Sequence, residues 1–213
     1  MSTTETTGTT GTTGSTGSTE IRFTRTDDAL GTFAVRPLDP FADAELLHGW
    51  VTHPKAAFWM MQEASLPDVE REYMRIAAHE HHDAFIGLHN GEPAFLMERY
   101  DPSQLELVGL YDAQPGDVGM HFLVAPSDTP LHGFTRAVIT TVMAALFADP
   151  ATKRVVVEPD VHNTAVHALN EAVGFVPERP VQKPEKEALL SFCTRAQFEA
   201  ATGIFASCQE AAI

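Results

Sequence analysis

Between Asp117 and Phe175, apolar runs and helical spacings alternate in the order strand, helix, strand, helix. The run DVGMHFLVAP predicts the first strand, and TPLHGFTRAVITTVMAALF predicts a Gly-containing loop followed by an amphipathic helix. RVVVEP predicts a second strand, and NTAVHALNEAVGF predicts a helix that stops at a Gly-Phe pair. This order implies two parallel strands joined by a right-handed crossover helix.

Alternating and helical patterns also fill the N-terminal third of the chain. IRFT and TFAVRPL alternate like strands. DPFADAELLHGWVTH has helical spacing, and we expect Pro40 in its first turn, with Phe41, Leu46, Leu47 and Trp50 on the inward face. LPDVEREYMRIAAHEHH predicts a second helix.

A hairpin is predicted where DAFIGLH and EPAFLMERYDP flank the turn dipeptide Asn90-Gly91. QLELVGLY fits a short strand or a loop, KEALLSFCTR predicts a last strand, and TRAQFEAAT predicts a terminal helix. The patterns together predict an α/β (α+β) fold: a mixed sheet of six or seven strands, with flanking helices, an antiparallel N-terminal meander and one parallel pair.

Composition sets limits on partners and compartment. With 213 residues, of which 44% are hydrophobic, we expect a single domain over residues 20–213, preceded by a disordered Thr/Ser/Gly-rich tail over residues 1–19. The net charge of −15 makes nucleic acid and anionic membrane poor partners. The two cysteines form no CxxC motif and no apolar run reaches membrane-spanning length, so we expect a reduced, cytoplasmic protein.

Two polar residues interrupt the otherwise apolar parallel strands, His121 in the first and Asp160 at the end of the second. Ligands of α/β folds bind at the carboxyl ends of such strands. An imidazole titrates near neutral pH and suits a general base, and a carboxylate can orient it. The alternative is that His121 is a hydrogen-bonded core histidine and that Asp160 caps the turn DVHN.

Five segments resemble, in order, the siderophore-biosynthesis N-acyltransferases of the GNAT fold: HPKAAFWMM, GEPAFLMERYDP, GMHFLVAP, HGFTRAV and RVVVEPDVHN. NTAVHALNEAVGF is similar to the GNAT signature helix. The resemblance extends from about Phe33 to Arg195 and implies a GNAT-like sheet with an acyl-CoA cleft at the parallel pair. It also implies that His121 and Asp160 are the catalytic pair. The implied reaction transfers an acetyl, succinyl or longer acyl group to the N-hydroxylated or free amine of cadaverine or lysine.

The same resemblance implies an acyl-CoA site, with acetyl-CoA or succinyl-CoA as the leading donors. We expect it to be formed by Val124, Leu131, His132, Gly133, Phe134 and Asn163. The loop departs from the GNAT pattern because it has one glycine and no arginine at its start. Asn163 alternatively serves only as the N-cap of its helix. Asn170 stands where many GNATs carry a tyrosine that protonates the leaving thiolate, which leaves that proton donor open.

Trp59 and Glu98 are expected to contact the acceptor, against the alternatives that Trp59 fills the core and that Glu98 is a surface carboxylate. The implied partners are acyl-CoA, a small amine or hydroxylamine, and pathway enzymes. The HEHH cluster lacks metal-ligand spacing, so we expect no metal. Two other functions remain open: an inactive GNAT-fold CoA-binding module, and a generic small-molecule N-acetyltransferase.

Overall fold

The computed structural model describes residues 20–204, so the predicted tail over residues 1–19 and Cys208 lie outside the described residues. The described chain forms one eight-stranded sheet with the order β1-β2-β3-β4-β5-β6-β8-β7. The strands are β1 (Phe23–Asp27), β2 (Gly31–Pro37), β3 (His82–His89), β4 (Glu92–Tyr100), β5 (Asp117–Val124), β6 (Arg154–Val157), β7 (Val176–Gln182) and β8 (Glu187–Thr194).

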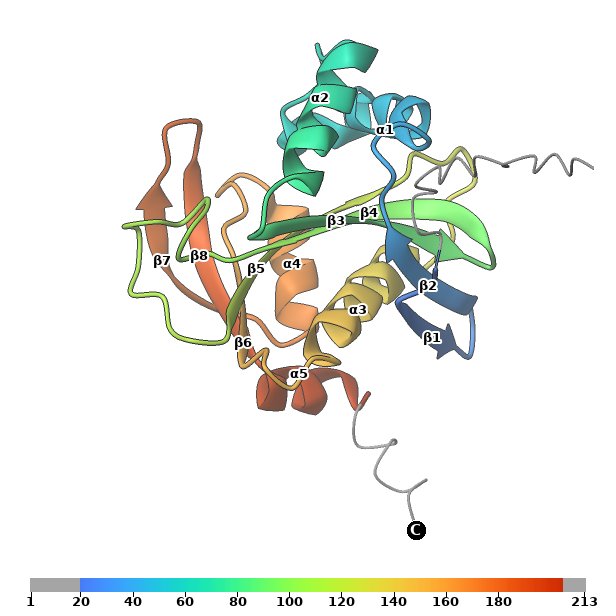
Figure 1. Ribbon diagram of the computed structural model, residues 1–213. Coiled ribbons are helices and arrows are strands. Elements are labelled where there is room, and N and C mark those ends of the chain that lie inside the picture. The colour runs from blue at the N-terminus through green and yellow to red at the C-terminus, as the bar shows by residue number, and fades with distance from the viewer. Residues whose placement is uncertain (1–19, 205–213) are drawn as a thin grey trace, which may run out of the picture.

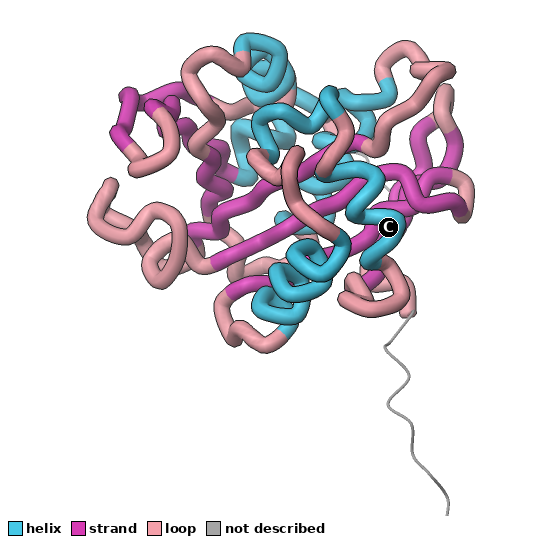
Figure 2. Tube along the Cα trace, turned by 90° about the horizontal axis from the view of Figure 1, so that it is seen from above, coloured by secondary structure: helices cyan, strands magenta, loops and turns pink. Residues whose placement is uncertain are grey.

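Helices cover both faces of this sheet (Figure 1 and Figure 2). They are α1 (Ala44–Val51), the 3-10 helix η1 (Pro54–Trp59), α2 (Leu66–Ala77), α3 (Phe134–Phe147), α4 (Thr164–Ala172) and α5 (Arg195–Thr202). In Figure 1, α1 and α2 lie above the sheet, whereas α3, α4 and α5 lie below it. The predicted α/β fold with an antiparallel meander and one parallel pair is confirmed.

The parallel strands β5 and β6 separate after a short paired stretch. Residues Asp117–Gly119 of β5 pair with Arg154–Val156 of β6, and the pairing ends there. Beyond that point β5 stays with β4 as far as Val124. The chain after β6 follows β8 instead, through the bridge between Asp160 and Ala188. The edge of β5 that faces β6 therefore has no strand partner over residues 120–124, and its backbone groups are open to a ligand.

The two sides of the split face different cores. Met120 packs with residues of α3 in one core, whereas Leu123 packs against the core formed by α1 and α2. Successive side chains of a strand alternate between the faces, so His121 shares the α1/α2 face with Leu123. By the same alternation, Val157 belongs to the α3 core and Glu158 points to the α1/α2 face.

The sheet has more strands than the six or seven predicted, partly because β7 was missed. Most of β7 is exposed, and it contains Pro177 and Pro180. Prolines are tolerated in edge strands, and an exposed edge strand does not need alternating apolar residues. Its sequence therefore carried no strand signal. QLELVGLY lies outside the named strands and forms turns.

The first helix was predicted to begin too early. The carboxylate of Asp39 accepts hydrogen bonds from the amides of Phe41 and Ala42, which forms a turn in place of a helix start. α1 begins at Ala44, so Pro40 is not in its first turn. Phe41 is 68% exposed, which makes its predicted inward position wrong, whereas Leu47 and Trp50 are buried as predicted.

Candidate functional site

A cavity of about 1330 Å³ lies at the split between β5 and β6. Its wall combines β5, the chain after β6, η1, the loop before α3 and one face of α4. Residues from both faces of the sheet contribute, including Trp59, Glu98, His121, Glu158, Asp160 and Asn170. The cavity therefore connects the α3/α4 face with the α1/α2 face through the opening in the sheet.

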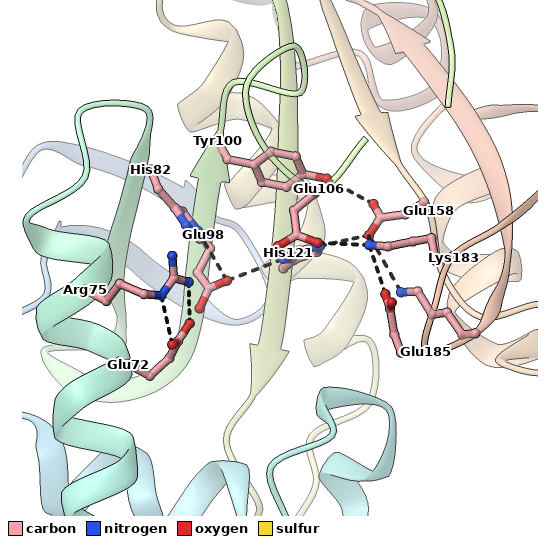
Figure 3. Close-up of polar contacts among 11 residues, drawn as sticks. Glu72, Arg75, His82, Glu98, Tyr100, Glu106, His121, Glu158, Lys183 and Glu185 are labelled. Atoms are coloured by element: carbon pink, nitrogen blue, oxygen red, sulfur yellow. Dashed lines mark hydrogen bonds and ion pairs between the residues drawn. The ribbon is translucent and has the colours of Figure 1, made fainter. Parts of the chain in front are cut away.

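His121 lies between two buried carboxylates (Figure 3). Its Nδ1 is 3.4 Å from Oε2 of Glu98, and its Nε2 is 3.2 Å from Oε1 of Glu158. An ionised carboxylate only accepts hydrogen bonds, so both ring nitrogens must donate, which requires the protonated imidazolium. Burial alone would lower the pKa of His121, but the charge and hydrogen bond of Glu158, followed by those of Glu98, raise it to about 10.

This environment argues against the general-base role predicted for His121. A general base needs a free lone pair, and here neither ring nitrogen has one. The imidazolium instead brings a fixed positive charge and two acidic protons to the cavity wall. Its side chain is 29% exposed, so the ring is accessible from the cavity.

Glu98 is one of the two carboxylates that hold the imidazolium. The β4–β5 register places it directly opposite His121. It is only 6% exposed, so the surface-carboxylate alternative is wrong. Burial opposes its ionisation, but the hydrogen bond from His121 and the nearby ring of His82 outweigh burial and lower the pKa of Glu98 to about 2. Nε2 of His82 lies 3.7 Å from Oε2 of Glu98.

Glu158 is the second carboxylate, and the sequence analysis did not single it out. It is 2% exposed, and it accepts hydrogen bonds from the Tyr100 hydroxyl at 3.1 Å and from Lys183 Nζ at 3.1 Å. Lys186 Nζ lies 3.7 Å away. Burial favours the neutral acid, but the positive charges of His121, Lys183 and Lys186 outweigh it and lower the pKa of Glu158. Its position directly after β6, on the face of His121, was the signal that could have identified it.

Lys183 connects this carboxylate to two further segments. Its Nζ also contacts Glu106 at 2.9 Å in the loop before β5 and Glu185 at 3.2 Å in the β7–β8 turn (Figure 3). The lysine is 5% exposed, and Glu158, followed by Glu106, raises its pKa despite burial. The β7–β8 turn thus reaches into the site and keeps Glu158 ionised.

Asp160 does not contact His121 in this arrangement. Its Oδ1 accepts from the backbone amide of His162 at 2.8 Å and lies 2.8 Å from His162 Nδ1. The structure thus gives Asp160 the turn-capping contacts of the alternative reading and makes Glu158 the orienting partner of His121. Asp160 still lines the cavity, so a catalytic role for it stays a prediction.

The residues predicted to hold acyl-CoA divide into two groups. Val124, Leu131, Phe134 and Asn163 line the cavity, whereas His132 and Gly133 lie in the same loop but outside its wall. Gly133 adopts a φ of 77° at the start of α3, which has no side-chain cap. The first amides of a helix that lacks a cap suit a phosphate group.

Asn163 and Trp59 each have the structural role given as the alternative and also line the cavity, so their predicted ligand contacts stay predictions. Asn163 is the N-cap of α4, accepting from the Val166 amide, and it also lines the cavity. Trp59 packs partly against the α1/α2 core, and its ring meets His121 edge-on at a centroid distance of 6.2 Å. Trp59 is therefore placed to form the wall beside the imidazolium.

Other candidate chemistries find little support among the described residues. Within residues 20–204, no group of three or more His, Cys, Asp or Glu side chains is arranged to hold a metal ion, and the metal-free site stays a prediction. Cys193 is buried, and burial raises the pKa of its thiol to about 12, so it is a poor nucleophile. No helix in this part of the chain is long and apolar enough to cross a membrane.

A family model described as an acetyltransferase (GNAT) domain matches residues 39–183, more than half of the chain. The chain therefore belongs to the GNAT acetyltransferase family. Among solved structures, an uncharacterized protein from Bacillus halodurans has the same fold, with a TM-score of 0.79, 24% identity and coverage of 84% of this chain and 93% of that one. The aminoglycoside acetyltransferase AAC(6')-Ib, solved with paromomycin and acetyl-CoA, has a TM-score of 0.72 at 22% identity, covering 80% and 97%.

Curated relatives of the chain include acyltransferases that are named for lysine, N-hydroxyputrescine and N(6)-hydroxylysine. The chain is 29% identical to the lysine N-acyltransferase MbtK of a Mycobacterium species, over 67% of this chain and 59% of that protein. It is 26% identical to the N-hydroxyputrescine acetyltransferase of Acinetobacter baumannii, over 78% and 80%. It is 26% identical to the N(6)-hydroxylysine O-acetyltransferase of Escherichia coli, over 79% of this chain and 54% of that protein. The chain thus spans little more than half of two of these relatives.

Proposed function

We propose that this protein is an acyl-CoA-dependent N-acyltransferase of hydroxamate siderophore biosynthesis. Its acceptor is an N-hydroxylated amine derived from cadaverine or lysine, and its donor is acetyl-CoA, succinyl-CoA or a longer acyl-CoA. The names of the curated relatives support the reaction class. The observation that carries the choice of acceptor is the imidazolium of His121, held by Glu98 and Glu158.

Two features of the cleft support an acyl-CoA donor. The edge of β5 over residues 120–124 leaves backbone groups that an extended arm can bind as an added strand would. The start of α3 offers uncapped amides to a pyrophosphate. Val124, at the end of β5, and Phe134, at the start of α3, both line the cavity, so the arm and the phosphates fit one continuous surface.

The charge state of His121 favours a hydroxylamine acceptor. An alkylamine is protonated near neutral pH and must lose a proton before its nitrogen can attack. An imidazolium with both nitrogens donating cannot remove that proton. A hydroxylamine nitrogen is less basic than an alkylamine, so much of it is neutral already and attacks without a base.

The bonds and protons of the proposed reaction balance while His121 stays protonated. The acceptor nitrogen bonds to the thioester carbon, the C–S bond breaks, and sulfur leaves with the bonding pair. The acceptor nitrogen releases one proton as it is acylated, and this proton neutralises the departing thiolate through water. His121 keeps its own proton throughout, because its pKa of about 10 lies above the ordinary value of a thiol, about 8.5. Its positive charge stabilises the oxyanion that develops on the thioester oxygen.

The direct test is thiol release combined with mass spectrometry of the product. Acetyl-CoA and succinyl-CoA are each incubated with N-hydroxycadaverine, hydroxylysine, cadaverine and lysine. We expect a hydroxamate with at least one N-hydroxylated acceptor, and slower reaction with the matching amine. No thiol release with any acceptor would support a CoA-binding module without activity. Reaction with amines alone would contradict the siderophore assignment.

A further inference from the structure

Asn170 lies in the second turn of α4, and its side-chain amide makes no hydrogen bond within residues 20–204. The residue is 3% exposed and lines the cavity at the split. Among residues 20–204, neither its Oδ1 nor its Nδ2 has a hydrogen-bond partner. Buried polar atoms without partners destabilise a protein, so a native one in a cavity wall points to a group that binds there.

Asn170 lies on the side of the split where we expect the acyl-CoA donor to bind. Asn163, Val166 and Asn170 share one face of α4, and all three line the cavity. Leu169, the neighbour of Asn170, packs against the core that α3 forms with Met120. His121 points to the opposite face of the sheet, so Asn170 faces the arm of the donor and not the acceptor.

The two side-chain atoms of Asn170 without partners, Oδ1 and Nδ2, indicate which kind of ligand group could bind there. A carboxamide offers a donor and an acceptor side by side, and both are unpartnered here. A thiolate would use only the donor, whereas a secondary amide would use both. The pantetheine arm of an acyl-CoA contains secondary amides, and the distance from Asn163 to Asn170 along the helix is roughly 10 Å, so α4 can run beside the arm.

We propose that Asn170 binds an amide of the pantetheine arm through a paired donor and acceptor contact, and that it positions the thioester at the opening beside His121. This inference rests on the proposed acyl-CoA function. It makes Asn170 a binding residue, and it leaves protonation of the thiolate to other groups because a carboxamide is not an acid at neutral pH.

The test compares Asn170→Leu with the wild-type protein in calorimetric titrations. Leu has a similar size and no polar atom, so the melting temperature without ligand should stay the same or rise. The Kd for CoA should increase about tenfold or more, since two hydrogen bonds are lost. Adenosine 3′,5′-bisphosphate lacks the arm, so its Kd should not change. Asn170→Asp keeps the shape and the acceptor but loses the donor, and it should also weaken CoA binding.

The outcomes separate this inference from the proposed function. If wild-type protein binds no CoA, the proposed function fails and the inference fails with it. If wild-type protein and Asn170→Leu bind CoA equally well, only the inference about Asn170 is overturned. The side-chain amide of Asn170 would then not bind the arm. An equal loss of affinity for CoA and for adenosine 3′,5′-bisphosphate would also overturn it, because the effect would not be specific to the arm.

Discussion

Nε2 of His121 lies 3.2 Å from Oε1 of Glu158 across the split in the sheet, beyond the last paired residues of β5 and β6. The contact thus replaces the strand pairing that ends at Gly119 and Val156. Because Glu98 holds the other ring nitrogen, the histidine is fixed as a cation at the point where the cavity passes through the sheet.

Glu158→Gln should lower kcat by roughly 10²-fold, because a neutral amide no longer stabilises the imidazolium. The matched control is Glu185→Gln, which also loses a contact to Lys183 but does not touch His121. It should change kcat by less than about threefold. Turnover per folded molecule, measured beside a melting curve, distinguishes catalysis from stability. Equal kcat losses in the two variants would contradict the role of Glu158.

Asp160→Asn tests which carboxylate orients His121: Asp160, as the sequence predicted, or Glu158, as the structure shows. Asp160 bonds to His162, so its loss should lower kcat by less than about tenfold, and by less than the loss of Glu158. The kcat values of both variants are measured under the same conditions. A greater loss with Asp160→Asn than with Glu158→Gln would restore Asp160 as the working partner of His121.

Gly119→Ala should disturb the site from within β5, the strand that also carries His121. A Cβ at Gly119 would overlap the ring of Tyr100, whose hydroxyl donates to Glu158. The ring must move, so we expect a loss of about 1–3 kcal/mol in the free energy of unfolding and a lower kcat. Tyr100→Phe serves as the control because it removes the hydroxyl and keeps the ring. A Gly119→Ala protein with wild-type stability and kcat would show that the ring is not held there.

Much of the fold could be predicted because its elements carry strong local signals. The apolar run of β5, the Asn90-Gly91 turn and the helix that ends before Gly174 each follow from pattern alone. The edge strand β7 could not be predicted, because its residues face solvent and need no alternation. The start of α1 was misplaced because the Asp39 carboxylate forms a local turn that competes with the helix.

The sequence pattern identified His121, but it did not identify which carboxylates hold it. His121 could be recognised because it interrupts an apolar strand. Glu158 and Asp160 are both acidic, are two residues apart and follow the same strand, so alternation alone does not separate them. The local turn with His162 engages Asp160 and leaves Glu158 to be buried. The second carboxylate, Glu98, reaches His121 only through the β4–β5 register, which the sequence between those strands does not specify.

The pH dependence of kcat with two acceptors of different basicity tests the central claim most directly. Because its pKa is raised from 6.5 to about 10, His121 stays protonated across pH 6–9 and should add no rising limb there. With N-hydroxycadaverine and cadaverine at saturation, any rising limb should follow the measured pKa of each acceptor, and kcat should fall only as the pH approaches 10. A limb fixed near pH 6.5 for both acceptors would contradict this account, because it would show His121 acting as a neutral general base.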